Sequence, residues 1–106
     1  MRNNFIVVFI TCASGKEAVR ISGALLKKRL AACVNTMHGI DSRFWWEGKI
    51  VKAKETFVIA KTTRAAFAAL EHEVKKVHSY EVPEIIALPI IAGNKSYLSW
   101  IDKSVK

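Results

Sequence analysis

The densest group of chemically versatile side chains in the sequence lies between residues 78 and 84. It contains an imidazole, a phenol and two carboxylates, from His78, Tyr80, Glu81 and Glu84. The three side chains that we consider further are His78, Tyr80 and Glu84. Imidazole and carboxylate groups can ligate copper or zinc, and loops on rigid scaffolds commonly carry binding residues. A structural alternative stays open, in which His78 serves a helix C-terminus and Tyr80 fills a gap in the core. We assign all three as candidate ligand-binding residues, with Glu84 and His78 as candidate metal ligands.

Lys61 is the candidate cation if the ligand is an anion. It stands directly before Thr62 and Thr63, where a strand is expected to end and a helix to begin. A helix N-terminus attracts anions, and a lysine beside it adds to that attraction. The alternative is an ordinary helix cap, in which a threonine hydroxyl accepts a hydrogen bond from the backbone.

Two adjacent tryptophans, Trp45 and Trp46, precede an expected turn over residues 47–49. Neighbouring side chains on a strand point to opposite faces, so one ring can pack inward while the other projects. The pair could form a stacking surface for a ligand. Because tryptophan is enriched at protein interfaces, we favour Trp45 and Trp46 as anchors of a subunit interface.

Common catalytic signatures are absent from the sequence. It contains no glycine-rich phosphate loop, no G-x-S-x-G, no H-E-x-x-H and no C-x-x-C. No nucleophile has an obvious base partner in the sequence. We therefore expect a protein that is not an enzyme.

Length and charge narrow the class further. The 106 residues predict a single domain, 1–106, and the 51% hydrophobic content excludes a disordered chain. The net charge of +8 would attract polyanions. However, the third expected strand lacks the Lys/Arg-Gly-aromatic signature of RNA-binding RRM domains. Nucleic acid is therefore an unlikely partner, and an RNA-binding domain is the weakest reading.

The apolar runs and the cysteines indicate the compartment. The run over residues 5–10 is shorter than the ~7–15 residues of a signal-peptide core, and no run approaches the ~18 residues of a membrane span. Cys12 and Cys33 are too few for a disulfide framework. The sequence thus predicts a cytoplasmic protein with free thiols and no membrane association.

Hydrophobic periodicity predicts the elements that must position these residues. Strands are expected over residues 5–10, 31–38 continuing at 43–46, 50–61 and 84–91, with a bend or bulge near Gly39. Ser14 and Glu17 have the S-x-x-E spacing of a capping box, which predicts a helix over residues 15–29. Two further helices are expected, one from Thr62 or Thr63 to about residue 78 and one after Asn94. The order β-α-β-β-α-β with an extra C-terminal helix is that of an α+β, ferredoxin-like antiparallel sheet.

The first and last strands are apolar on both faces rather than alternating. A sheet face that is open to water should alternate, and two helices can cover only one face. We therefore expect another copy of the chain to cover the second face.

Five segments, in order along nearly the whole chain, resemble the motifs of the CutA family, small proteins named for divalent-cation tolerance. The segments are Arg29-Leu-Ala-Ala-Cys-Val-Asn35, Trp46-Glu-Gly-Lys-Ile50, Lys61-Thr-Thr63, His78-Ser-Tyr-Glu-Val-Pro-Glu-Ile-Ile86 and Tyr97-Leu-Ser-Trp100. The resemblance implies a ferredoxin-like fold, a tight homotrimer, a link to copper and other divalent metals, and an architecture similar to PII signalling proteins.

The resemblance carries over only part of a proposed copper site. Some bacterial relatives place a Cys late in the first strand and a second His before the His-x-Tyr motif, and these act with the motif's Glu. The matching positions here are Ile10 and Val77, so that only Glu84 carries over. Cys12 lies two residues beyond Ile10, on the same face if the strand continues.

These observations lead to one expected function and one alternative. The first is a cytoplasmic homotrimeric binding protein linked to tolerance of divalent metals such as copper. The alternative is a PII-like regulator that binds a small anionic ligand in clefts between subunits and signals to a partner protein.

Overall fold

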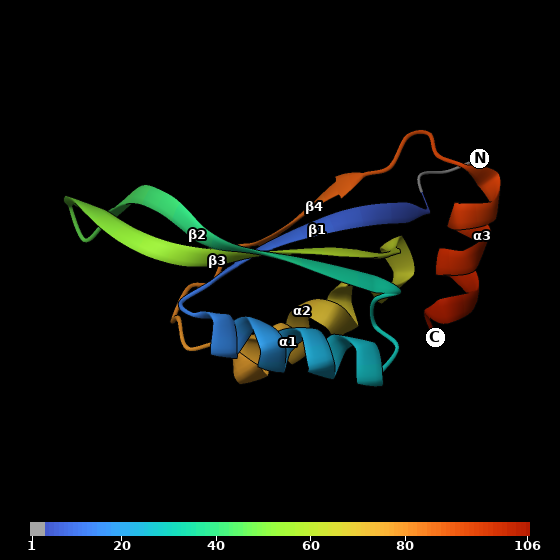
Figure 1. Cartoon of the computed structure of the whole chain (residues 1–106), viewed down its shortest axis with the longest axis horizontal. Coiled ribbons are helices and arrows are strands. Elements are labelled where there is room, and N and C mark those ends of the chain that lie inside the picture. Colours follow the sequence, from blue (N-terminus) through green and yellow to red (C-terminus); the bar gives the residue numbers. More distant parts are fainter. Residues whose placement is uncertain (1–3) are drawn as a thin grey trace.

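The computed structural model describes residues 4–106, whose four strands form one antiparallel sheet in the order β2-β3-β1-β4 (Figure 1). The elements are β1 (Phe5–Cys12), α1 (Gly15–Lys27), β2 (Cys33–Trp46), β3 (Lys49–Thr63), the 3₁₀ turn η1 (Arg64–Ala66), α2 (Phe67–Val77), β4 (Ile85–Pro89) and α3 (Lys95–Ser104). This order confirms the predicted ferredoxin-like α+β fold with an extra C-terminal helix. Among the described residues, no helix is long and apolar enough to cross a membrane.

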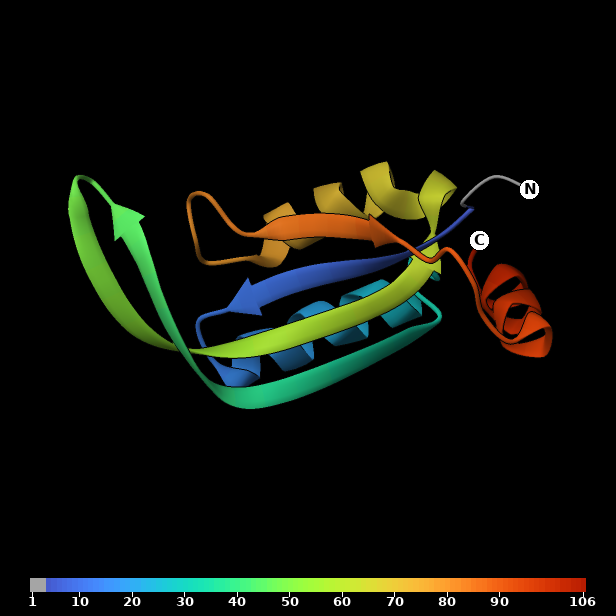
Figure 2. The ribbon, with the colours of Figure 1, turned by 90° about the horizontal axis from the view of Figure 1, so that it is seen from above.

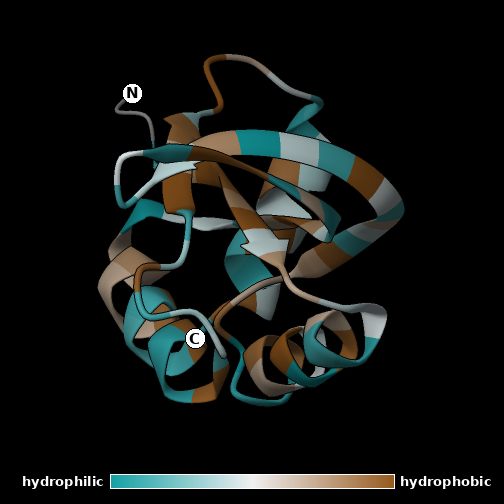
Figure 3. Ribbon diagram, turned by 90° about the vertical axis from the view of Figure 1, so that its left-hand side faces the viewer, coloured by the Kyte–Doolittle hydropathy of each residue, from teal (hydrophilic) through white to brown (hydrophobic). Residues whose placement is uncertain are grey.

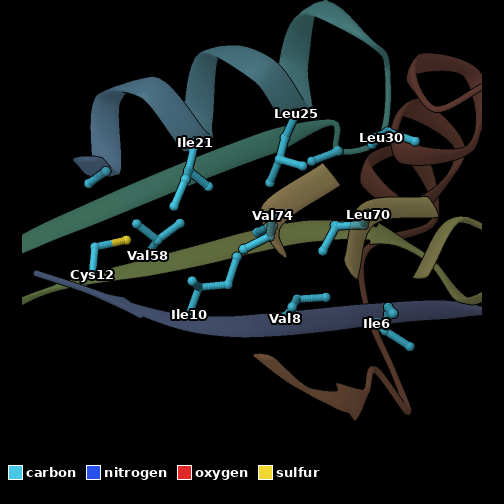
Figure 4. Packing of buried hydrophobic residues seen from close by; sticks show 13 residues of the cluster. Ile6, Val8, Ile10, Cys12, Ile21, Leu25, Leu30, Val58, Leu70 and Val74 are labelled. Carbon is cyan, nitrogen blue, oxygen red and sulfur yellow. The ribbon is translucent and has the colours of Figure 1, made fainter. Parts of the chain in front are cut away.

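Helices α1 and α2 cover one face of the sheet, and the hydrophobic core lies between these layers (Figures 1 and 4). Alternate residues of β1 point into it: Ile6, Val8, Ile10 and Cys12 are buried, and the residues between them are half-buried. Ile21 and Leu25 of α1 and Leu70 and Val74 of α2 meet them from the other side. Burying each such side chain stabilises the fold by roughly 1.5–3 kcal/mol.

Helix α1 begins at a capping box. The Ser14 hydroxyl accepts a hydrogen bond from the Glu17 backbone N–H at 3.2 Å, and a Glu17 carboxylate oxygen accepts one from the Ala13 N–H at 2.9 Å. The predicted Ser14 cap is therefore confirmed, with the return bond shifted by one residue from the usual pattern. Thr63, one of the two predicted caps, accepts from the Ala66 N–H at 3.3 Å and begins η1.

The β2–β3 hairpin is longer than expected and extends well beyond the rest of the sheet (Figure 1). Its register shifts between Met37 and Ile40, where Gly39 has φ of +70°, so the predicted bulge is confirmed. Glu47 and Gly48 form the tip, both with positive φ, as two-residue hairpin turns require. Figure 2 shows the outer part of the hairpin curving away from the line of the inner strands.

β4 is shorter than expected and ends at Pro89 rather than near residue 91. Proline lacks the N–H that would continue the ladder. The pairing of Phe9 with Ile86 and of Val7 with Leu88 places these four side chains on the sheet face opposite the helices. In the single chain this face is incompletely covered, with Ile86 50% and Leu88 44% exposed. Figure 3 shows hydrophobic stretches along the strands.

Candidate functional site

The segment over residues 78–84 joins α2 to β4, and the buried His78 side chain anchors its start. The backbone N–H of Tyr80 donates to His78 Nδ1 at 3.0 Å. Nδ1 is therefore the acceptor, and the proton on Nε2 is donated to the Thr11 carbonyl at 2.7 Å. Both ring nitrogens are engaged, so His78 ties this segment to the end of β1.

The Glu17 carboxylate joins two loops that are far apart in the sequence. One oxygen accepts from the Ala13 N–H, and the other accepts from the Ser79 N–H at 2.7 Å. Burial would raise the pKa of Glu17, but the hydrogen bonds from Ser79 and Ala13 and the nearby His78 outweigh it and hold the pKa below its ordinary value. The ionised form of Glu17 is thus the one that the fold stabilises.

Cys12 completes a buried group with these two residues. Potential ligand atoms of Cys12, Glu17 and His78 all lie within 4.8 Å of one another, and within residues 4–106 this is the one group of at least three such side chains that could hold a metal ion. A thiol, an imidazole and a carboxylate are suitable donors for copper or zinc.

The donors of this group are nevertheless occupied. Hydrogen bonds engage both nitrogens of His78 and both oxygens of Glu17. Burial, followed by the charges of Glu17 and Glu55, raises the pKa of Cys12 to about 12, so Cys12 is a neutral thiol rather than the thiolate that binds metals. The group as folded therefore does not fit a permanently bound metal ion, and its hydrogen bonds brace the fold.

Tyr80 connects the same segment to β3. Its hydroxyl donates to Glu55 Oε2 at 2.6 Å, and its ring lies 4.8 Å from that of His78. Burial, the hydrogen bond to Glu55 and the nearby negative charges raise the pKa of Tyr80, which keeps it a phenol and a donor. Both side chains are therefore bonded within the fold, as in the structural alternative. The His78 ring, however, bonds the end of β1 rather than the C-terminus of α2, and Tyr80 lies outside the hydrophobic core.

Two adjoining hollows are lined by residues of both the β2–β3 hairpin and segment 78–84. The smaller has a volume of about 430 Å³ and the larger of about 590 Å³. Four residues line both of them: Phe44, Trp46, Tyr80 and Val82. The larger is also bordered by acidic side chains from three different strands or loops: Asp41, Glu55 and Glu84.

The predicted site residues do not all come together in the single chain. Tyr80 and Glu84 border the larger hollow, whereas His78 is buried beneath the segment. Lys61 donates to Asn35 and lies six residues along β3 from Glu55, a separation of about 20 Å on an extended strand.

The two tryptophans assigned to a subunit interface lie next to the hairpin tip. Trp45 and Trp46 are both exposed, and both border the larger hollow. Ile10 belongs to the hydrophobic core, and Val77 packs against it.

Three residues of this region were not identified as site residues from the sequence. Glu17 was expected only as half of a capping box, and Cys12 only as a possible substitute ligand. Glu55 carries no local signal in the sequence, because it lies between Lys54 and Thr56 in the middle of β3.

The chain matches known proteins over nearly all of its length. Residues 6–104 match the family model described as CutA1 divalent ion tolerance protein. A divalent-cation tolerance protein CutA of Archaeoglobus fulgidus is 51% identical over 104 residues, which cover 98% of this chain and 99% of that protein. The chloroplastic protein CutA 1 of rice is 44% identical over 95% of this chain, which spans only 57% of the rice protein.

Solved structures agree with the sequence comparisons. The structure of the periplasmic divalent cation tolerance protein CutA from Archaeoglobus fulgidus superposes with a TM-score of 0.93 and 49% identity, and the match covers 96% of this chain and 99% of that one. The names of the Archaeoglobus fulgidus protein and of its structure describe divalent-cation tolerance. The family model and the identities together establish that the chain belongs to the CutA1 family of divalent ion tolerance proteins.

Proposed function

We propose that this CutA1-family protein is a cytoplasmic homotrimeric binding protein that acts in the response to divalent metal ions, copper being the first ion to test. The observation that carries the proposal is the convergence of Cys12 and Glu17 with His78 at the start of segment 78–84. The same segment supplies Glu84 at its other end. In the free protein, hydrogen bonds occupy the donor atoms of His78 and Glu17. This is compatible with a metal ion that binds transiently and is not permanently bound.

Metal binding at the internal group competes with the proton and the hydrogen bonds already there, which predicts how its affinity depends on pH. A metal at the internal group must displace the Cys12 proton and a hydrogen bond of His78. Because metal binding at such a group releases protons, its affinity should rise with pH.

The test is calorimetric titration of the assembled protein with Cu(II) and Zn(II), with a thermal melt of each variant. We expect Glu84→Gln to lower metal affinity at least about tenfold, because an amide is a weaker donor than a carboxylate. Glu47→Gln, at the hairpin tip, is the matched control. Unchanged affinity with a lower melting temperature would mean that Glu84 braces the fold and does not bind metal.

A second variant separates the two possible metal positions. Cys12→Ser keeps the size of the side chain and removes the sulfur donor. If its affinity falls and that of Glu84→Gln does not, the internal group is the site. If neither changes, both positions are wrong.

The PII-like alternative rests on Lys61. Its ammonium group lies on the sheet face that the helices leave open. There it donates a hydrogen bond to Asn35, which is its diagonal neighbour across the β2–β3 ladder. Covering this face with other subunits would leave a cation near a subunit boundary, where a small anion could pair with it. Thermal-shift assays with phosphate, citrate and ATP test this reading, and Lys61→Gln should abolish any stabilisation that they cause.

A further inference from the structure

The larger hollow has an acidic lining in a strongly basic protein. Asp41, Glu55 and Glu84 border it, whereas Arg43 is the one cation among its described lining residues. The chain as a whole carries a net charge of +8. Asp41 is paired with Lys54 at 3.0 Å outside this lining. The remaining charged groups of the lining are Glu55, Glu84 and Arg43, which leave the hollow with a net negative charge.

Glu55 supplies the most specific of these charges. Glu55 is only 6% exposed. The Tyr80 hydroxyl donates a hydrogen bond to one of its carboxylate oxygens, Oε2. In the described part of the chain, no hydrogen bond reaches the second oxygen, Oε1. Among the described residues, Ser22 Oγ is the one fully buried polar side-chain atom without a hydrogen-bond partner, so Glu55 Oε1 keeps contact with solvent. Because Glu55 borders the hollow, a ligand there could pair with this oxygen.

Aromatic rings form the remaining walls. Phe44 and Trp46 come from the hairpin and Tyr80 from segment 78–84, so the rings face the hollow from two separate elements. Aromatic faces attract cations that are only weakly hydrated, which favours alkylated ammonium groups. Together with the carboxylates, they provide both a charge and an apolar surface for such a group.

A metal ion fits this hollow less well. The carboxylates of Asp41, Glu55 and Glu84 are not close enough to act as joint ligands, since the one described group that meets that condition consists of Cys12, Glu17 and His78. The volume of about 590 Å³ instead suits a small organic molecule.

We propose that this hollow binds a small organic cation whose alkylated ammonium group lies against Trp46 and Tyr80 and pairs with Glu55 and Glu84. The inference rests on the proposed binding role of segment 78–84 but does not depend on metal binding. The ligand is held by charge and by the aromatic faces together, so a neutral molecule of the same shape binds worse.

The decisive comparison is choline against its neutral isostere, 3,3-dimethyl-1-butanol. Both are titrated by calorimetry into the assembled protein in the presence of a chelator, and tryptophan fluorescence is followed in parallel. We expect choline to bind about tenfold more tightly than the isostere. Raising the salt concentration should weaken choline binding and leave the isostere unaffected.

Matched variants locate the site. Trp46→Leu should reduce choline affinity at least about fivefold, whereas Trp100→Leu, which removes a similarly exposed tryptophan from α3, should not (42% and 44% exposed). Glu84→Gln should also weaken choline binding, and Glu71→Gln on α2 should not. Neither member of the tryptophan pair should change the affinity for Cu(II).

Three results would overturn the inference: equal binding of choline and the isostere, no binding of either, or equal losses in the two tryptophan variants. The absence of choline binding would also result if a neighbouring subunit filled the hollow, and that outcome equally refutes a ligand site there. Failure of the metal titrations alone would refute the metal proposal and leave this one standing.

Discussion

Glu17 connects two loops that are far apart in the sequence. Its two carboxylate oxygens bind the backbone of the β1–α1 turn, at Ala13, and of the α2–β4 segment, at Ser79. The second contact spans 62 residues of sequence. Glu17 therefore determines where segment 78–84 lies, and with it the walls of both hollows.

We expect Glu17→Gln to destabilise the protein at neutral pH by about 1–2 kcal/mol, because the amide replaces one of two acceptor oxygens and leaves a buried N–H without a partner. The folded-state pKa of Glu17 lies below its ordinary value of 4.5. Its stabilising contribution is therefore complete above that value and is lost as the pH falls through the lower, folded pKa.

Thermal melts at fixed protein concentration over a range of pH check this expectation. The melting temperatures of wild type and Glu17→Gln should differ most at neutral pH and converge below pH 4.5. Glu71→Gln, which removes an i,i+4 pair with Lys75 at 3.5 Å on α2, is the control and should have a small effect. A constant difference between wild type and Glu17→Gln at every pH would contradict the assigned pKa direction.

Among the elements, the β2–β3 hairpin does most to shape the site. Its bulge between Met37 and Ile40 precedes the curved outer part that faces segment 78–84. Bulges increase local twist and bend a strand. The hollow therefore depends on Gly39, whose φ of +70° strongly favours glycine.

Two glycine substitutions should have opposite effects. Gly39→Ala should destabilise the protein by about 1–2 kcal/mol, because a left-handed conformation is strained for residues with a Cβ. Gly23→Ala, within α1, should stabilise it by about 0.5–1 kcal/mol, since no atom lies within 4 Å of the added methyl group. Thermal melts of both variants measure the signs, and a destabilising Gly23→Ala would count against the open environment on α1.

Local signals explain why the elements could be predicted from the sequence. Ser14, Thr63 and Asn94 each cap a helix through a bond that spans three residues. The strand ends were less predictable. β3 continues to Lys49 and Thr63 because its partner β2 extends alongside it, and pairing between strands is not visible in one segment alone.

The candidate site was predictable only where its residues are close in sequence. His78, Tyr80 and Glu84 drew attention because they lie within seven positions of the chain. The contacts of Tyr80 with Glu55 and of Ser79 with Glu17 depend on tertiary packing across 25 and 62 residues. No local pattern encodes such contacts, and the same limit explains why Lys61 was grouped with residues that lie elsewhere on the sheet.

At the scale of the whole molecule, the single chain leaves an apolar sheet face exposed on the side opposite the helices. The sheet face opposite the helices carries Val7, Phe9 and Phe57, with the Phe9 and Phe57 rings 5.2 Å apart, next to the exposed Ile86 and Leu88. A contiguous apolar face of this kind marks an interaction surface. The proposed trimer would bury it.

We therefore expect sedimentation equilibrium at micromolar concentration to give about three times the chain mass of 11.9 kDa. Leu88→Lys places a charge in the centre of the proposed interface and should shift the protein towards monomer, because burying an unpaired ammonium group is costly. Val19→Lys is the control. Val19 is 69% exposed on α1, so this substitution should not affect assembly.

A wild-type mass near 11.9 kDa would refute the trimer. A Leu88→Lys variant that remained trimeric would show that the subunits meet through another surface, and the hairpin tryptophans Trp45 and Trp46 would then be the next interface to test.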